Sequence, residues 1–92
     1  MSHVANVNSG KEILMTLFLV HCGFYDEEIS DGIYEFHINF PIVAENVDEA
    51  KKKVRVLPQF ISKKMHIDGI QKIDRIDGHA ISFSATWFLN AE

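Results

Sequence analysis

The chain has 92 residues, which is the length of a single domain. Its composition is 47% hydrophobic with seven Phe and one Trp, which is typical of a globular protein and excludes a disordered one. The formal net charge of −4 argues against nucleic-acid binding through phosphate neutralisation. The single cysteine, Cys22, excludes an internal disulfide and fits a reducing cytoplasm.

The N-terminal part divides into a tail and a strand. Residues 1–10 show no hydrophobic period and are expected to form a flexible N-terminal tail, so that residues 11–92 make up a single α+β domain. Residues 13–22 are almost all apolar, which predicts a central strand covered on both faces. This run is far shorter than the roughly 20 residues that span a bilayer. It also lacks the basic start of a signal peptide, so we expect a cytoplasmic protein with no membrane segment.

A loop and a second strand follow. Residues 23–32 begin and end with glycine and carry several acids, and we expect them to join two antiparallel strands. Residues 33–44 alternate, with the aromatic and aliphatic side chains on one face and Glu35 and His37 on the other. Pro41 has no backbone N–H to donate, so this strand is expected at an edge of the sheet.

Residues 45–58 are predicted to contain the one main helix. Asn46 is placed to accept a hydrogen bond from the backbone N–H of Glu49, which is typical of a helix start. Acids occupy the first turn and bases the later turns, as the helix dipole favours. Pro58 is expected to end the helix. Residues 59–66 are expected to close a short turn against the core.

The last two predicted strands flank a tight turn. Residues 81–87 alternate in polarity, and Asp77-Gly78 predicts a two-residue type I′ hairpin, which needs positive φ at both positions. Before this turn, isoleucine recurs at every third position from Ile67 to Ile76, which fits neither a regular strand nor a helix. We therefore predict a bulged strand there.

The element order predicts an α+β fold: a four-stranded, mostly antiparallel sheet with one helix on one face (strand–strand–helix–strand–strand). One helix of about three turns is too short to cover both faces of such a sheet. Because the first strand is apolar on both faces, we expect a second copy of the chain to cover the open face in a homodimer. The alternative is that residues 1–10 or 59–66 cover it.

Four residues form the candidate site. His66 and Asp68 lie two apart on a strand and therefore point the same way, as do Glu35 and His37 on the second strand. Together they offer the imidazole and carboxylate groups of a metal site or an acid–base pair. The alternative is that His66 bonds a loop carbonyl, because spacing alone does not establish that the four converge.

The remaining motifs favour structural roles. His21 and Cys22 are a candidate base and nucleophile, but neighbours on a strand face opposite sides, so we expect Cys22 to be a buried structural thiol. The acids of residues 26–31 lack the order of a calcium loop, and the bases of residues 51–64 are expected on the solvent side of the helix. No Gly-rich phosphate loop, nucleophile elbow or CxxC occurs, so no cofactor is predicted.

Four segments carry a resemblance to a known family: "LFLVHCGFYDEE", "YEFH", "VAENVDEAKKKV" and "HIDGIQKIDRIDGHAI". In this order they resemble the bacterial family known as domain of unknown function 1543, over roughly residues 14–81. The sequence departs from that family at Phe24, where a second glycine is common, and at His79, where an aromatic residue is common. Longer members carry two copies in one chain, so the resemblance implies that a single copy pairs with itself. It implies no activity.

We favour a small dimeric interaction or ligand-binding domain without catalytic activity. The alternative is a metal-dependent or acid–base enzyme that uses Glu35, His37, His66 and Asp68. Contact with RNA or DNA through residues 51–64 is a weaker third hypothesis. The enzyme hypothesis requires the four residues to converge in a concave pocket, whereas the binding hypothesis allows them to lie on an exposed sheet face.

Overall fold

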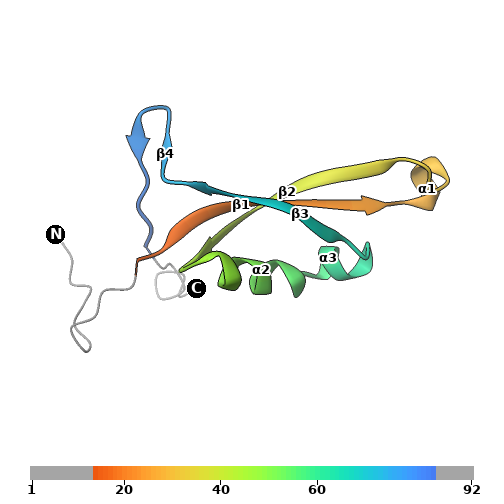
Figure 1. Cartoon of the computed structure of the whole chain (residues 1–92), viewed down its shortest axis with the longest axis horizontal. Coiled ribbons are helices and arrows are strands. Elements are labelled where there is room, and N and C mark those ends of the chain that lie inside the picture. The colour runs from red at the N-terminus through yellow and green to blue at the C-terminus, as the bar shows by residue number, and fades with distance from the viewer. Residues whose placement is uncertain (1–13, 85–92) are drawn as a thin grey trace, which may run out of the picture.

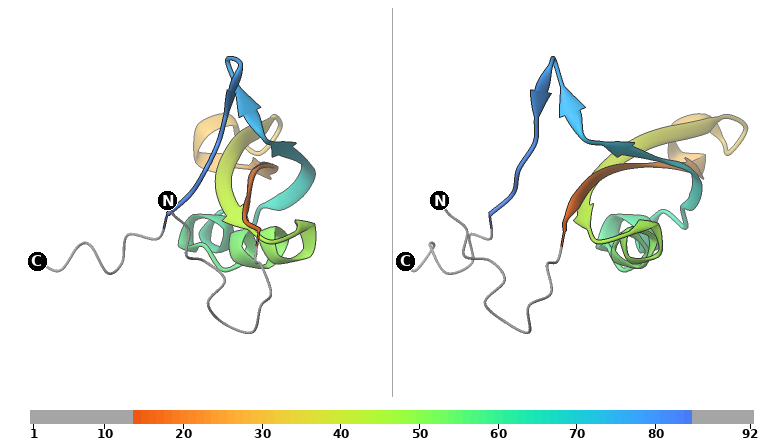
Figure 2. Two further views of the ribbon diagram at one scale, coloured as in Figure 1. Left: turned by 90° about the vertical axis from the view of Figure 1, so that its left-hand side faces the viewer. Right: turned by 60° about the vertical axis from the view of Figure 1, so that its left-hand side comes forward.

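The computed structural model describes residues 14–84, so the tail predicted at residues 1–10 and the end of the last predicted strand lie outside it. Within residues 14–84, strands β1 (Thr16–Tyr25), β2 (Glu35–Ala44) and β3 (His66–Ile73) form an antiparallel sheet with the order β2-β1-β3. Helices α2 (Val47–Arg55) and α3 (Pro58–Ser62) lie on one face of this sheet (Figures 1 and 2). The α+β class predicted from the sequence is confirmed.

Strand β1 occupies the centre of the sheet, as its apolar sequence predicts, and β2 lies at an edge, as Pro41 predicts. Residues that face each other across an antiparallel pair point to the same side of the sheet. Val20 pairs with Phe40 and Cys22 with Ile38, and these pairs lie on the face that the helices cover. The alternate residues of β1 lie on the other face, which we call the open face: Leu17, Leu19, His21 and Gly23.

Helix α2 begins where its sequence predicts but ends earlier, at Arg55, and Pro58 begins α3 instead of ending α2. The Asn46 side chain accepts a hydrogen bond from the Glu49 backbone N–H at 2.9 Å, and Glu49 Oε1 accepts one from the Glu45 N–H at 2.6 Å. Leu57 is extended, as a residue before proline prefers, and it separates α2 from α3. Pro58 then occupies the first turn of α3, where its missing N–H has no partner to lose.

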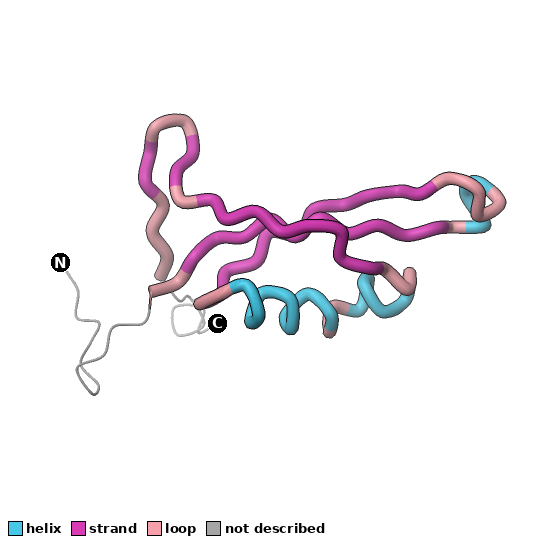
Figure 3. Tube along the Cα trace, viewed as in Figure 1, coloured by secondary structure: helices cyan, strands magenta, loops and turns pink. Residues whose placement is uncertain are grey.

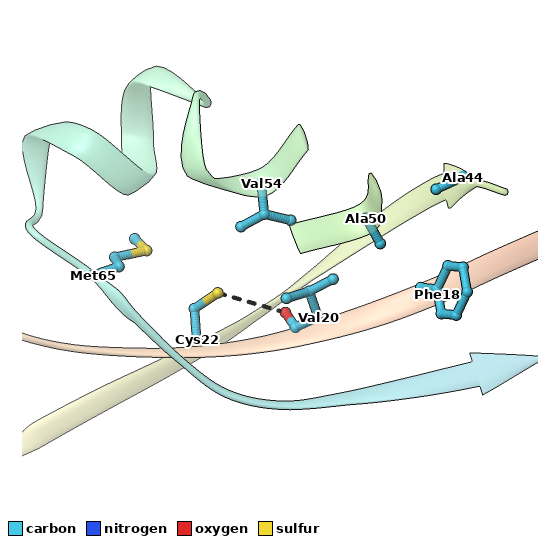
Figure 4. Packing of buried hydrophobic residues seen from close by; sticks show 7 residues of the cluster. All are labelled: Phe18, Val20, Cys22, Ala44, Ala50, Val54 and Met65. Atoms are coloured by element: carbon cyan, nitrogen blue, oxygen red, sulfur yellow. Dashed lines mark hydrogen bonds between the residues drawn. The ribbon is translucent and has the colours of Figure 1, made fainter. Parts of the chain in front are cut away.

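The core lies between the helices and the sheet. Val54 and Ala50 of α2 pack over Val20 and Cys22 of β1, all without solvent exposure (Figure 4). Met65 is buried in this same core, so residues 59–66 help to cover the face that carries the helices and not the open face. The segment does not pack against the core along its whole length as expected, since the Ile61 side chain within it is 60% exposed.

The prediction of four strands in one sheet is wrong for the described residues, whose main sheet has three. After β3 the chain leaves the sheet at Asp74, a residue type with low strand propensity. It then forms a separate hairpin of β4 (Arg75–Ile76) and β5 (His79–Ala80), which projects from the sheet (Figures 1 and 3). Residues 81–84 have no regular structure, and the rest of the predicted strand lies outside the described residues.

The connection between β1 and β2 is anchored at its first residue. Asp26 accepts a hydrogen bond from the Glu28 N–H at 2.9 Å and begins the short helix α1 (Glu27–Ser30). Although it is an acid, Asp26 is buried, and Lys63 Nζ donates to its Oδ2 at 2.6 Å. This bond holds the pKa of the Asp26 carboxyl below its usual value and raises the pKa of Lys63. The pair ties the end of β1 to the turn after α3.

None of the helices within residues 14–84 has both the length and the apolar character that a transmembrane span requires.

Candidate metal centre

The open face of the sheet divides into an apolar half and a polar half. On β1, Leu17 and Leu19 precede His21 and Gly23 on this face. Gly23 pairs with His37 of β2 on one side and with His66 of β3 on the other. The central strand therefore lacks a side chain at the point where two histidines flank it.

A bulge in β3 adds Asp68 to this group. Cys22 pairs with Ile67 and His21 pairs with Gly69, so Asp68 is one extra residue between the two pairs. The extra residue lets Ile67 and Ile70 both pack against the core, although they are three positions apart. The bulge predicted from the isoleucine spacing is thus present, and it places the Asp68 carboxylate beside His66 on the open face.

The four residues singled out in the sequence come together. His66 Nε2 donates to Glu35 Oε2 at 2.6 Å and lies 3.2 Å from Asp68 Oδ1. His37 Nε2 lies 3.5 Å from Glu35 Oε1 and 3.3 Å from Asp68 Oδ2. Each carboxylate therefore turns one oxygen to each imidazole, and the four side chains close a ring of alternating nitrogen and oxygen ligands. We call these four residues the open-face cluster.

Gly23 provides the space beneath the open-face cluster. A methyl group at this position would overlap Glu35 Oε2 and would lie 2.7 Å from Asp68 Oδ2 and 2.8 Å from His66 Nε2. Glycine 23 is itself buried, although it lies on the open face, because the cluster side chains cover it. The absence of a side chain on the central strand thus allows ligands from both outer strands to meet over it.

His21 also belongs to this region, although its position beside Cys22 in the sequence suggested only a pairing with that thiol. Its ring stacks on that of His37, with centroids 4.8 Å apart and an interplanar angle of 9°. Its Nδ1 donates to Asn39 Oδ1 at 2.7 Å, which leaves Nε2 with the free lone pair. Strand alternation contains the signal that was missed, because it places His21, Gly23 and their partners on one face.

Cys22 faces away from the cluster, as predicted. The residue is fully buried, and its Sγ lies 3.8 Å from the Val20 carbonyl oxygen (Figure 4). Burial raises the pKa of the Cys22 thiol, and the negative charge of Asp68 raises it further. A thiol with a raised pKa is a weak nucleophile and a poor metal ligand, so Cys22 serves as a core residue.

The open-face cluster is accessible to solutes. Its side chains are between 29% exposed, for Glu35, and 47% exposed, for His66. With neutral histidines the cluster carries two negative charges from its carboxylates, a charge that attracts cations. Two cavities elsewhere in the described chain, a groove of about 540 Å³ between α1 and the end of α3 and one of about 60 Å³ beside Leu17, include none of the four residues.

The other predicted turn and loop residues lie apart from this cluster. Asp77 and Gly78 form the loop of the β4–β5 hairpin, with φ of 52° and 78°. His79 Nδ1 donates to the Asp77 carbonyl oxygen at 2.8 Å, so this histidine closes the turn. Asp26, in the acidic segment, forms an ion pair with Lys63 and does not belong to the open-face cluster.

Comparison of the chain with protein-family models, with curated proteins and with solved structures finds no match. The resemblance to domain of unknown function 1543 therefore stays a prediction from the sequence.

Proposed function

We propose that this domain binds a divalent transition-metal ion at the open-face cluster of Glu35, His37, His66 and Asp68. The observation that carries the proposal is the convergence of two imidazoles and two carboxylates from β2 and β3 over Gly23. The sequence favoured an interaction or ligand-binding domain, and the alternative was a metal-dependent or acid–base enzyme with the four residues in a concave pocket. The four residues come together on an exposed sheet face, an arrangement that favours metal binding without a reaction.

The spacing of the ligand atoms suits a metal ion. Nitrogen and oxygen ligands bind zinc at about 2.0–2.1 Å, so in a tetrahedral site neighbouring ligand atoms lie about 3.3 Å apart. Three of the four nitrogen–oxygen separations in the cluster are 3.2, 3.3 and 3.5 Å, and because each carboxylate meets the two imidazoles through different oxygens, they are separations at one imidazole or the other. The fourth, between His66 and Glu35, is a hydrogen bond of 2.6 Å, and a bound ion would take the place of its proton.

The donor set selects the class of metal. Imidazole suits zinc, copper, iron and nickel, whereas sites for magnesium and calcium consist of oxygen ligands. A cluster with equal numbers of imidazole and carboxylate groups should therefore prefer zinc and its neighbours to the alkaline-earth ions. We name Zn²⁺ as the probe ion, because it accepts nitrogen and oxygen ligands in a four-coordinate geometry.

The proposal includes no reaction. An enzyme would need the cluster to lie in a concave pocket, and none of its residues lines either cavity named above. Binding of metal on an exposed sheet face is compatible with the interaction or ligand-binding domain favoured from the sequence. In that case the metal ion is the ligand or holds it.

A second copy of the chain stays part of the proposal. Leu17 and Leu19 lie on the open face next to the cluster, opposite the helices, and both are only partly buried. A homodimer that covered them would shield apolar surface without displacing the helices. Sedimentation equilibrium of the tag-free chain tests this directly, and the mass of one chain at all concentrations would contradict it.

The experiment for metal binding is native mass spectrometry of the chain purified without a polyhistidine tag. After addition of Zn²⁺ and removal of the excess, the wild-type chain should retain zinc. A His37→Asn/His66→Asn double variant should not retain it, because both imidazole ligands are gone. The matched control is His79→Asn, which removes an exposed histidine of the β4–β5 hairpin and should leave zinc retention unchanged.

Two results would contradict the proposal. One is a wild-type chain that retains no zinc while far-UV circular dichroism shows it folded. The other is equal retention by the wild-type chain and the double variant, which would place the metal elsewhere.

A further inference from the structure

We infer that the open face holds two metal ions, with Asp68 bridging them and His21 serving as an additional ligand. The inference rests on the proposed function and extends it from one ion to a pair. It draws on two groups of side chains that share one carboxylate, and on a histidine that lies outside the open-face cluster defined above.

The first group consists of His21, His37 and Asp68, and the second of Glu35, His66 and Asp68. In each group the three ligand atoms lie within 4.8 Å of one another. Asp68 is the residue common to both. Three protein ligands are the usual number in a zinc site that keeps a position open for water or another ligand.

The two oxygens of Asp68 face opposite imidazoles. Oδ2 lies 3.3 Å from His37 Nε2, and Oδ1 lies 3.2 Å from His66 Nε2. A carboxylate that presents one oxygen to each of two imidazoles is placed to bind one ion through each oxygen. Glu35 lies closer to His66 (2.6 Å) than to His37 (3.5 Å) and belongs only to the second group, so Asp68 is the bridging carboxylate. Two-metal sites in proteins hold their ions about 3.5–4 Å apart, a separation that a bridging carboxylate spans.

The surroundings of His21 are those of a metal ligand. Metal-bound histidines almost always donate their second ring N–H to a neighbouring acceptor, which fixes the tautomer and the ring orientation. His21 donates from Nδ1 to Asn39 Oδ1 at 2.7 Å, and its ring stacks on that of His37. Asn39 is thus a positioning residue for His21.

Counting the ions by native mass spectrometry tests the inference. With excess Zn²⁺ the wild-type chain should reach two ions per chain, counted on a monomer or divided by the number of chains in an oligomer. His21→Asn should reach only one, because the first group loses a ligand and the second keeps all three. Asn39→Ala should lower the affinity for the first ion about 10-fold or more, because His21 loses its orienting partner. The affinity for the second ion should not change.

The outcomes separate this inference from the proposed function. A maximum of one ion per chain, unchanged in His21→Asn, would overturn the pair of ions and leave a single-ion cluster. A folded chain that takes up no ion would overturn both proposals. If His21→Asn is unfolded by circular dichroism, Mn²⁺ loading of the wild-type chain decides instead. A bridged pair gives an exchange-coupled electron paramagnetic resonance spectrum, whereas the six-line spectrum of an isolated Mn²⁺ would overturn the inference.

Discussion

The two faces of the sheet are built by the same strands but take opposite roles. On the covered face, Val20 and Cys22 of β1 are fully buried beneath α2 and belong to the hydrophobic core. On the open face, His21 and Gly23 of the same strand lie among imidazoles and carboxylates from β2 and β3. One-residue alternation along a single strand thus separates the part that stabilises the fold from the part that offers ligands.

The separation predicts that a charge is tolerated on one face only. Val20→Asp would bury an ionised group without a partner among Val54 and Cys22, and we expect it to cost about 3 kcal/mol or more of unfolding free energy. That loss is a large fraction of the stability of a small domain. The matched variant is Gln71→Asp on the open face, where the side chain is exposed in the single chain, and at concentrations that keep the chain monomeric the expected change is below about 0.5 kcal/mol. Urea denaturation followed by circular dichroism compares them, and equal losses would refute the distinction.

The two strand glycines of the open face provide a sharper comparison. Gly23→Ala should lower zinc affinity about 10-fold or more, because its methyl group would displace the ends of Glu35, Asp68 and His66. The fold should survive, since only side-chain ends have to move and alanine is compatible with a strand.

Gly69→Ala is the control for this change. Gly69 pairs with His21 in the same sheet, yet a methyl group there would meet nothing within 4 Å. Zinc affinity measured by competition titration should therefore stay at the wild-type value. If both variants bound zinc as the wild-type chain does, the space above Gly23 would have no role in the site.

A smaller effect on stability than that of Val20→Asp is expected from Asp26, whose carboxylate pairs with Lys63 and has a structural role. Because Lys63 lowers the pKa of Asp26 in the folded chain, the unfolded chain binds a proton first as the pH falls. The stability from this pair is therefore fully present above the ordinary aspartate pKa of about 3.9 and is lost as the pH falls from there through the lower folded value. Asp26→Asn keeps an acceptor for the Glu28 N–H but removes the charge.

The Asp26→Asn variant should be less stable than the wild-type chain at pH 7, and the difference should shrink below about pH 4. Thermal unfolding over pH 3–7 measures this. A difference that stayed constant over this range would show that the charge of Asp26 contributes nothing. Zinc retention at pH 7 should not change, because Asp26 lies outside the open-face cluster.

Local patterns in the sequence predicted much of this architecture. The alternation of residues 33–44, the Asn46 cap and the Asp77-Gly78 turn each depend on neighbours in sequence, and the structure contains all three elements. The prediction of a four-stranded sheet was wrong because the alternation in residues 81–84 does not specify which strand they pair with. Pairing depends on where the chain leaves β3 at Asp74, and that departure is a tertiary property.

The candidate site was predictable in its residues but not in its assembly. Glu35, His37, His66 and Asp68 follow from spacing, whereas their convergence depends on the register of β1 between β2 and β3. Spacing likewise gave no role to Gly23 and His21. A glycine in an apolar strand weakens the strand unless something occupies the space above it, and the register determines what does.

The most direct test of the separation between the two faces is X-ray absorption spectroscopy of the zinc-loaded chain at the zinc edge. The account predicts a coordination shell of nitrogen and oxygen atoms at about 2.0–2.1 Å with the scattering pattern of imidazole and with no sulfur. Cys22 is one residue from His21 in sequence, but its buried thiol lies on the other face. A zinc–sulfur distance of about 2.3 Å would contradict the account, because it would place Cys22 among the ligands.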